Sequence, residues 1–386
     1  MIIQPANRLS DVQEYYFSKK LKEIRELNVS GKNIINLGIG SPDLAPSQET
    51  IEALIETAEK TNTHGYQSYT GIPELRNAIS SWMASTYGVD FKAENEILPL
   101  MGSKEGIMHI SMAFLNPGDK VLVPDPGYPT YTSVSNLLDA DIEFYDLDEQ
   151  NGWNVDVERL KQKDLSKVKL LWLNFPHMPT GAKADVHILQ ELINLANENK
   201  FLIVNDNPYS LILNPKPRSI FNLKGSKDVC LELNSLSKSH NMAGWRIGWL
   251  SGSPEYISTV LRVKSNMDSG MFLGLQKAAV KALSNPMHWH EDQNNIYAKR
   301  RKLIEEIFDY LQVKYNPDSV GMFVWAKVPN SVDSVEKFVD DILYKANVFI
   351  TPGFIFGSNG ERFIRASLCA SQETIKEALT RIKANV

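Results

Sequence analysis

Short apolar runs alternate with longer amphipathic stretches along the first two thirds of the chain. Six apolar runs of strand length, each bounded by turn residues, lie at 120–126, 141–147, 168–175, 201–206, 229–236 and 246–253. Continuous apolar runs of this length are typical of strands that are buried on both faces. The stretches 72–87 and 186–200 carry helical signals, with Pro73 in a first turn and Gly88 as a C-cap. This alternation predicts an α/β fold with a largely parallel sheet covered by helices.

The last hundred residues have a different pattern. A charged helical run at 294–311 comes first, and the segments that follow read as strand 322–328, helix 335–346, strands 348–353 and 362–368, and helix 373–384. Helices and strands in this order predict a second, smaller α+β unit.

Composition and charge narrow the class of protein. The 386 residues are 43% hydrophobic and 23% charged, as in globular proteins with a buried core, which excludes a disordered chain. The net charge of −5 argues against a nucleic-acid or anionic-membrane partner, which would need clustered Lys and Arg. Cys230 and Cys369 are too few for a disulfide framework or a Cys-rich zinc site. Without a signal-peptide pattern or an apolar run of membrane-spanning length, we expect a cytoplasmic protein.

The stretch 233–249, LNSLSKSHNMAGWRIGW, carries the densest candidate chemistry. Lys238 follows a predicted buried strand, where partial desolvation would lower its pKa and make its amine nucleophilic. Ser235, Ser237 and Arg246 are groups that suit an anionic phosphate. A solvated lysine in a Ser-rich loop is the alternative, and taken alone it would be the commoner outcome.

The same stretch resembles the cofactor-lysine motif of class I pyridoxal-phosphate aminotransferases, Ser-x-Ser-Lys followed by Gly-x-Arg-x-Gly. The resemblance implies pyridoxal 5'-phosphate as cofactor, bound covalently by a catalytic Lys238. It also implies fold type I, in which a mostly parallel seven-stranded sheet lies between helices and a smaller α+β domain is attached. On this basis we expect a large domain over 46–285 and a discontinuous small domain, with an N-terminal arm, over 1–45 and 286–386.

An acid against the cofactor's ring nitrogen is the next requirement of this chemistry. Asp206 ends the predicted strand 201–206, at the edge where open α/β sheets place their ligands. The family's Asp-x-x-Tyr pattern makes Asp206 catalytic and places Tyr209 at the ring's phenolate oxygen. An N-cap aspartate beside a packing tyrosine is the structural alternative.

A phosphate cradle is predicted at 98–107, LPLMGSKEGI. A helix is predicted to begin here, directly after Gly102, with Ser103 and Lys104 at its start. The backbone N–H groups at a helix N-terminus can bind phosphate. The spacing is not that of a P-loop. By resemblance, Ser235, Ser237 and Arg246 complete the cradle.

The remaining contacts are also implied by resemblance. Tyr128 would stack on the cofactor ring, and Arg365 would bind the substrate carboxylate, with an internal salt bridge as its alternative. Ile39 and Gly40, in NLGIGSPD, would line the substrate pocket.

One position departs from the family pattern. The stretch 174–182, NFPHMPTGA, matches Asn-x-Pro-x-Asn-Pro-Thr-Gly except that Met178 replaces the second Asn. Asn174 matches and is expected to contact cofactor and substrate. Methionine has no amide donor, so either Tyr209 and neighbouring groups suffice at this position or the electronics of the site are altered.

Two segments resemble contacts that cross a dimer interface. Tyr66 occupies the position from which class I enzymes reach the neighbour's cofactor phosphate, and Ser265 and Asn266 lie in a second such segment, 264–270. We therefore expect a homodimer with shared active sites.

Within the family, ILPLMGSKEGI, NPGDKVLVPDPGYP, NMAGWRIGW and VKSNMDSG look closest to bacterial LL-diaminopimelate aminotransferases. The implied activity is ping-pong transfer of an amino group from an L-amino acid to a 2-oxo acid such as 2-oxoglutarate. The donor could be LL-diaminopimelate or another dicarboxylic, aspartate-like amino acid. Three alternatives stay open: a β-lyase of the same fold, an aspartate- or methionine-type aminotransferase, and a non-enzymatic cofactor-binding regulator.

Two other features are interpreted as structural. His288 and His290 look metal-like, but residues two apart point to different faces of a helix, so we expect an exposed polar helix start and no metal site. Met101, Met108 and Met112 are expected to fill core.

Overall fold

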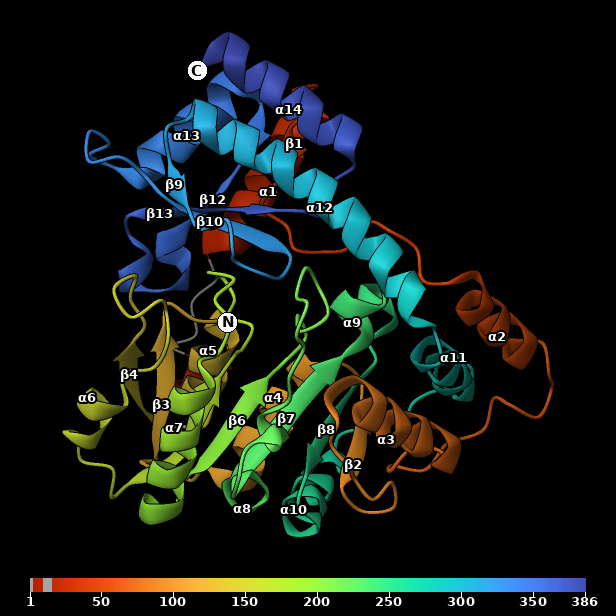
Figure 1. Ribbon diagram of the computed structural model, residues 1–386. Coiled ribbons are helices and arrows are strands. Elements are labelled where there is room, and N and C mark those ends of the chain that lie inside the picture. The colour runs from red at the N-terminus through yellow and green to blue at the C-terminus, as the bar shows by residue number, and fades with distance from the viewer. Residues whose placement is uncertain (1–2, 10–15) are drawn as a thin grey trace.

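A seven-stranded mixed sheet forms the centre of the computed structural model, which describes residues 3–9 and 16–386 (Figure 1). Only β8 runs antiparallel to its neighbours, and all other pairs are parallel. The strands, in spatial order, are β2 (Ile97–Leu100), β8 (Gly248–Gly252), β7 (Cys230–Ser235), β6 (Leu202–Asp206), β5 (Val168–Leu173), β3 (Lys120–Asp125) and β4 (Asp141–Asp146). The predicted largely parallel sheet is confirmed.

Helices cover both faces of this sheet, which explains why its strands are apolar throughout. In β5, Leu170 and Trp172 belong to one apolar cluster, while Leu171 and Leu173 belong to the cluster on the opposite face. The first face is covered by α4 (Ser103–Phe114), α5 (Pro129–Leu137) and α10 (Pro254–Lys264). The second is covered by α6 (Val157–Lys161), α7 (Val186–Asn199), α8 (Ser226–Val229), α3 (Pro73–Tyr87) and α11 (Leu273–Leu283), with α2 (Gln48–Ala58) packed on α11.

Local sequence signals set the ends of these helices. Pro73 is the first residue of α3, and Gly88 caps its end in the left-handed conformation, with φ of 68°. Asp185 caps α7 by accepting hydrogen bonds from the backbone N–H groups of His187 and Ile188. The helix predicted at 72–87 is confirmed.

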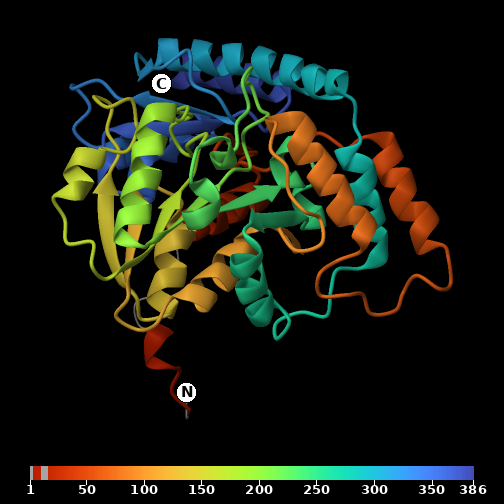
Figure 2. The ribbon, with the colours of Figure 1, turned by 60° about the horizontal axis from the view of Figure 1, so that its bottom comes forward.

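The C-terminal unit is built on a four-stranded antiparallel sheet above the carboxyl ends of the large sheet's parallel strands (Figure 1). Its strands, in spatial order, are β12 (Thr351–Pro352), β13 (Phe363–Ser367), β10 (Phe323–Lys327) and β9 (Lys314–Tyr315). Its helices are α12 (Met287–Tyr310), α13 (Val335–Ala346) and α14 (Gln372–Asn385). Figure 2 shows α12 and α14 side by side along its outer side.

The N-terminal segment joins this C-terminal unit. β1 (Ile35–Asn36) pairs in parallel with β11 (Val348–Phe349), and α1 (Tyr16–Val29) packs Ile24 against Leu343 and Phe349. The run 348–353 is thus divided between two sheets, so its prediction as one strand is wrong. These contacts support a discontinuous small domain, and its boundaries at 45/46 and 285/286 remain a prediction.

The start of α12 also differs from the expectation. α12 begins at Met287, and His290 is buried with its ring perpendicular to that of His240, at a centroid distance of 4.9 Å. The expected exposed start is therefore wrong at His290, because packing against the segment after Lys238 covers it.

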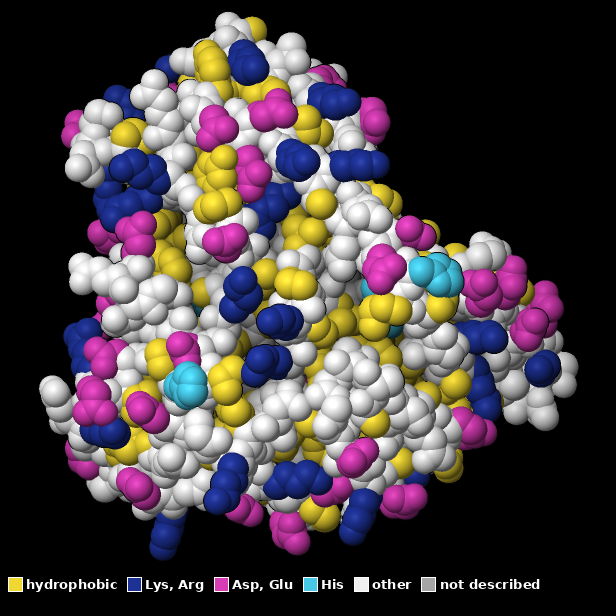
Figure 3. Space-filling view, in the orientation of Figure 1, with side chains coloured by type: hydrophobic (Ala, Val, Ile, Leu, Met, Phe, Trp, Pro, Cys, Tyr) yellow, Lys and Arg dark blue, Asp and Glu magenta, His cyan; other side chains and the backbone are white. Residues whose placement is uncertain are grey.

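The length of the apolar helices and the distribution of surface charge bear on whether a membrane or a polyanion could be a partner. None of the described helices is long and apolar enough to cross a membrane. On the face drawn in Figure 3, Lys and Arg side chains are interspersed with Asp and Glu and form no broad patch of one sign.

Candidate active site

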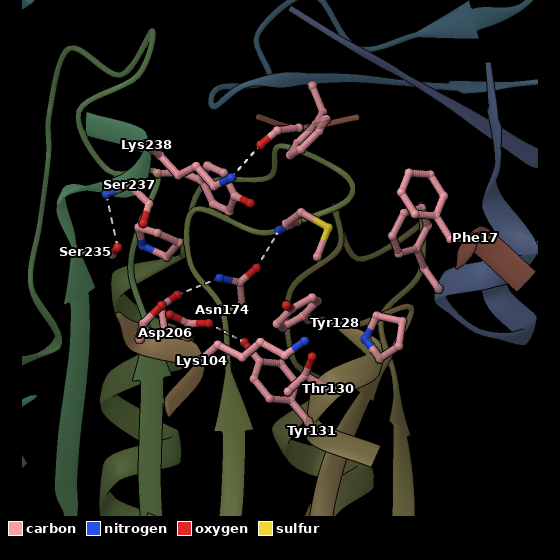
Figure 4. A pocket seen from close by; sticks show the side chains of 18 of the residues that line it. Phe17, Lys104, Tyr128, Thr130, Tyr131, Asn174, Asp206, Ser235, Ser237 and Lys238 are labelled. Carbon is pink, nitrogen blue, oxygen red and sulfur yellow. Dashed lines mark hydrogen bonds between the residues drawn. The ribbon is translucent and has the colours of Figure 1, made fainter. Parts of the chain in front are cut away.

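A cavity of about 660 Å³ lies at the carboxyl ends of the parallel strands, where the large sheet meets the small unit. Its walls come from the ends of β6 and β7, from the N-termini of α4 and α5, from β10 and β13, and from α1. Figure 4 shows Lys238 and Asp206 on one side of it and Phe17 on the opposite side.

Lys238 lies in the cavity on α9 (Leu236–Ser239), the short helix that directly follows β7. Its Nζ donates a hydrogen bond to the backbone oxygen of Gly40. Burial lowers the pKa of Lys238, and the positive charges of Arg365 and Arg246 lower it further. An amine held in this way loses its proton more readily and is a better nucleophile.

Asp206 ends β6 and is fully buried at the floor of the cavity. Tyr131 Oη donates to Asp206 Oδ2 at 3.0 Å, whereas Asp206 Oδ1 is buried and has no hydrogen-bond partner among the described residues. Burial raises the pKa of Asp206 to about 7. A protonated ring nitrogen would supply the missing donor and the compensating charge, so this carboxylate fits pyridoxal phosphate.

The residues predicted to form a phosphate cradle lie where α4, α9 and the segment before β8 converge. Gly102 precedes α4 with φ of 87°, and a Cβ there would lie 2.2 Å from Arg246 Nη2, so only glycine allows this close approach. Arg246 Nη1 donates to the backbone oxygen of Ala243 at 3.0 Å and weakly to Ser237 Oγ at 3.5 Å. Ser103 and Lys104 line the cavity at the N-terminus of α4, where the helix dipole and N–H groups favour an anion.

Ser235 supports this arrangement from below. Its Oγ accepts from the N–H of Ser237 at 3.1 Å and donates to the backbone oxygen of Ile247 at 3.2 Å. It therefore caps α9 and ties it to Ile247, the residue that follows Arg246. Ser235 also lines the cavity.

Arg365, on β13, is a fully buried cation without a carboxylate partner among the described residues. Its Nη2 donates to the backbone oxygen of Gly38 at 2.8 Å, and Nε has no partner. The guanidinium carbon lies 3.9 Å from the ring centroid of Phe323 and 4.6 Å from that of Phe356. Burial lowers the pKa of Arg365 to about 10. The structure thus lacks the internal salt bridge considered as the alternative, and the arginine is open to an anion from the cavity.

Asn174 and Met178 connect the acid to the arginine. Asn174 Nδ2 donates to the backbone oxygen of Asp206, and Oδ1 accepts from the N–H of Met178 at 2.8 Å. Met178 Sδ accepts from Arg365 Nη1 at 3.3 Å. In this structure Asn174 therefore braces the loop, and a thioether occupies the place beside the guanidinium where the family pattern has an amide.

The predicted aromatic residues also lie in the cavity. Tyr128 is the N-cap of α5, with its ring edge-on to Tyr131 at 5.6 Å. Tyr209 packs edge-on against Phe323 at 5.8 Å. Burial raises the pKa of Tyr209 strongly, so its hydroxyl stays protonated and can donate.

Five predicted positions lie outside the cavity lining. Gly102 is behind the cradle, and Ile39 is partly exposed beside the lining residue Gly40. Tyr66 is 94% exposed. Neither Ser265 nor Asn266, at the end of α10, reaches the cavity of its own chain.

Sequence reasoning missed several lining residues. Tyr131 had a usable signal, because it lies three residues after Tyr128, in the first turn of the helix that Tyr128 caps. Phe17, Leu21, Ile355 and Phe356 had none, since only the packing of α1 and the small unit brings them to the cavity.

Comparisons with known proteins agree with this geometry. The family model described as aminotransferase class I and II matches residues 32–382. An LL-diaminopimelate aminotransferase of Natranaerobius thermophilus is 37% identical over 382 residues, covering 98% of this chain and 99% of the relative. One from Moorella thermoacetica is 37% identical over 383 residues, covering 99% and 98%. The apo-BacF structure from Bacillus subtilis has a TM-score of 0.94 at 36% identity, covering 100% of this chain and 99% of that one.

Proposed function

The chain belongs to the class I and II aminotransferase family, and from this premise we propose how its residues carry out transamination. It is a pyridoxal-phosphate-dependent aminotransferase. The residue roles rest on three groups that meet at one cavity: a lysine with a lowered pKa, a buried carboxylate and a buried guanidinium. Among the described residues, neither the carboxylate nor the guanidinium forms an ion pair, and Asp206 Oδ1 and Arg365 Nε have no hydrogen-bond partner.

When bound, the cofactor supplies an electron sink for the substrate α-carbon and carries the amino group between two half-reactions. Lys238 would hold the cofactor covalently, and its amine would move a proton at the substrate α-carbon as general base and then acid. Asp206, oriented by Tyr131, holds the proton on the ring nitrogen. Arg365 binds the α-carboxylate and so positions the α-carbon.

The cradle residues hold the phosphate. Ser103 and Lys104 offer the N-terminus of α4, and Arg246 supplies the opposing charge, with Ser235 and Ser237 setting its position. Tyr128 and Tyr209 line the cavity. Tyr128 would stack on the ring, and the Tyr209 hydroxyl would donate to the ring's phenolate oxygen. The 2-oxo acid acceptor, such as 2-oxoglutarate, would bind through the same arginine, which requires ping-pong kinetics. Because the similar relatives are named LL-diaminopimelate aminotransferases, LL-diaminopimelate is the first amino donor to test.

A half-reaction screen tests this function. Purified holoenzyme is mixed with single L-amino acids, including LL-diaminopimelate, and the cofactor's absorbance is followed. A transaminase converts the cofactor to its amino form, and 2-oxoglutarate restores it. Release of ammonia and pyruvate from a cysteine conjugate without any 2-oxo acid would show a β-lyase instead, and spectral binding without turnover would show a regulator.

Lys238→Ala tests the central residue. The variant should lose both the absorbance band of the covalently bound cofactor and all turnover. Lys345→Ala, which changes an exposed lysine on α13, should keep both. A wild-type band in Lys238→Ala would overturn the assignment.

We also propose that the protein forms a homodimer with shared active sites and is located in the cytoplasm. Besides Tyr66, the exposed apolar side chains include Met101, Met112 and Met267, so the expected core role is wrong for Met101 and Met112. Tyr69, Met101 and Lys264 line a common small hollow, which brings these segments together. Exposed apolar side chains such as Tyr69 and Met101, which line this one hollow, favour a protein interface.

A further inference from the structure

We propose that Glu105, His109 and Asp268 bind one divalent transition-metal ion, for which Zn²⁺ is the best fit. This metal site is separate from the candidate active site, because none of its three residues lines the cavity that contains Lys238. It would join α4 to the loop between α10 and α11. The inference goes beyond transamination and does not depend on it.

The three side chains come together from two parts of the chain. Glu105 and His109 are four residues apart on α4 and therefore share a face of that helix. Asp268 reaches the same place from the loop after α10. One ligand atom from each of the three lies within 4.8 Å of the other two. Ligands bound to one Zn²⁺ lie roughly 3–3.5 Å apart, which small rotations of these side chains would provide.

His109 is buried without hydrogen bonds. It is 1% exposed, yet neither ring nitrogen has a hydrogen-bond partner among the described residues. Nε2 lies 3.0 Å from Glu105 Oε1, but the two atoms are not aligned as a hydrogen bond. Leaving a buried imidazole unpartnered costs free energy. A close nitrogen and oxygen that do not point at each other fit two ligands that point at one ion.

Asp268 also has an unused atom. Its side chain is 3% exposed, and Oδ1 accepts from Lys264 Nζ at 2.8 Å and from the N–H of Gly270 at 2.7 Å. Oδ2 is buried and has no hydrogen-bond partner among the described residues. A carboxylate oxygen in this position needs a cation or a donor, and a metal ion would supply it.

Glu105 divides its two oxygens in a similar way. Oε2 accepts from the backbone N–H of Met101 at 2.6 Å, which fixes the carboxylate at the start of α4. Oε1 is the atom beside His109. The side chain is therefore held in place by the helix start and still presents one oxygen to the metal site.

The charges at the metal site favour a cation of this kind. The ammonium of Lys264 offsets one of the two carboxylates, so with a neutral His109 the group carries one net negative charge. A transition-metal ion gains bonds to the imidazole in addition to this attraction, whereas Ca²⁺ and Mg²⁺ prefer several oxygen ligands. Water would complete the coordination, as in zinc sites with three protein ligands.

A protonated His109 shared by the two carboxylates is the competing arrangement, and it predicts no metal binding. The test uses holoenzyme freed of metal with a chelator and then dialysed. Titration with ZnCl₂ in a calorimeter should show saturable binding of one Zn²⁺ per chain. Zn²⁺ should also raise the midpoint of thermal unfolding, because it binds the folded chain at a site that unfolding destroys. The absence of saturable binding would overturn the inference.

Variants locate the ion. His109→Gln and Glu105→Gln each remove one metal ligand and should weaken Zn²⁺ binding at least about tenfold, the loss that even an outer partner of a metal ligand causes. Both variants should also lose the thermal shift on adding Zn²⁺. His187→Gln, which changes an exposed histidine on α7, is the matched control and should bind Zn²⁺ as wild type does.

The two variants guard against loss of folding, because glutamine keeps a polar side chain at either position and one folded variant suffices for the comparison. If a folded variant binds Zn²⁺ as tightly as wild type, the ion lies elsewhere and the inference is wrong.

Discussion

At the scale of single residues, Met178 changes the surroundings of the Arg365 guanidinium. The guanidinium is fully buried between two aromatic rings, and its neighbour Met178 Sδ is only a weak acceptor. An amide at this position could both accept from the arginine and donate to the cofactor. The thioether accepts only weakly and has no hydrogen to donate, so the arginine depends more on the substrate carboxylate for compensation.

Met178→Asn should restore an amide donor beside the cofactor's phenolate oxygen. Donation to the anionic form stabilises it, so the pH at which the bound cofactor's absorbance titrates should fall by about one unit. Met287→Asn, at an exposed position, is the control. A spectrophotometric titration with identical midpoints for variant and wild type would refute this role.

Asp206 makes the stability of the cofactor-free protein depend on pH. Its pKa is 3.8 in an ordinary setting and about 7 in the folded chain. Between these values the folded state holds a proton that the unfolded state has lost, so stability falls as pH rises. The fall attributable to Asp206 is up to roughly 4 kcal/mol.

Asp206→Asn should remove this part of the pH dependence. Urea unfolding of the cofactor-free proteins at several pH values between 4 and 7 measures it as the difference between wild type and variant. A constant difference across that range would contradict the raised pKa.

At the scale of elements, the segment after α10 is tied down by a buried ion pair. Lys264 Nζ lies 2.8 Å from Asp268 Oδ1, and both side chains are only 3% exposed. The same ammonium donates to the backbone oxygen of Tyr69 at 2.9 Å. This pair therefore joins the two segments that we propose to cross the dimer interface.

Asp268→Asn should lower the free energy of unfolding by about 3–5 kcal/mol, because it leaves the buried ammonium without its counter-charge. Asp341→Asn removes the exposed partner of Lys345, also four residues away, and should cost less than about 1 kcal/mol. Chemical denaturation of both variants checks the contrast. Equal losses would show that the Lys264–Asp268 pair is not effectively buried in solution.

At the scale of the whole molecule, the cavity exists only because three parts of the chain meet. The large sheet supplies the residues that we propose to bind the cofactor, the small unit supplies Arg365, and α1 contributes Phe17 and Leu21. Tyr66 is nevertheless 94% exposed in the single chain. A second chain would give this side chain a partner and complete the cradle.

Mixing two inactive or weakened variants tests shared sites. Lys238→Ala lacks the nucleophile, and Tyr66→Ala should lose activity through weaker cofactor binding. If Tyr66 serves the neighbouring site, hybrid dimers contain one intact site, and refolding an equal mixture should restore up to about a quarter of wild-type activity. No recovery in a mixture shown to contain hybrids would place Tyr66 outside the partner's site.

Local physics decided what could be predicted from the sequence alone. Apolar runs, Pro73 and Gly88 predict elements because hydrophobic periodicity and caps act within a few residues. The placement of Asp206 and Lys238 in one cavity follows from the rule that parallel strands present their carboxyl ends at one edge. The residues that we propose to bind the cofactor lie close to these strand ends and helix starts. Their motifs could therefore be recognised in the sequence.

Tertiary packing decided the rest. The bond from Tyr131 to Asp206, the burial of His290 and the division of 348–353 between two sheets depend on contacts between segments far apart in the sequence. The same is true of the apolar part of the cavity wall that comes from α1 and from the 3-10 helix η4 (Gly353–Phe356). Such contacts cannot be predicted from hydrophobic periodicity, because the periodicity of a segment indicates only its own secondary structure and not the distant segment it packs against. The sequence therefore determined which residues we propose for the reaction, because their motifs are local, and the three-dimensional packing determined the shape of the cavity around them.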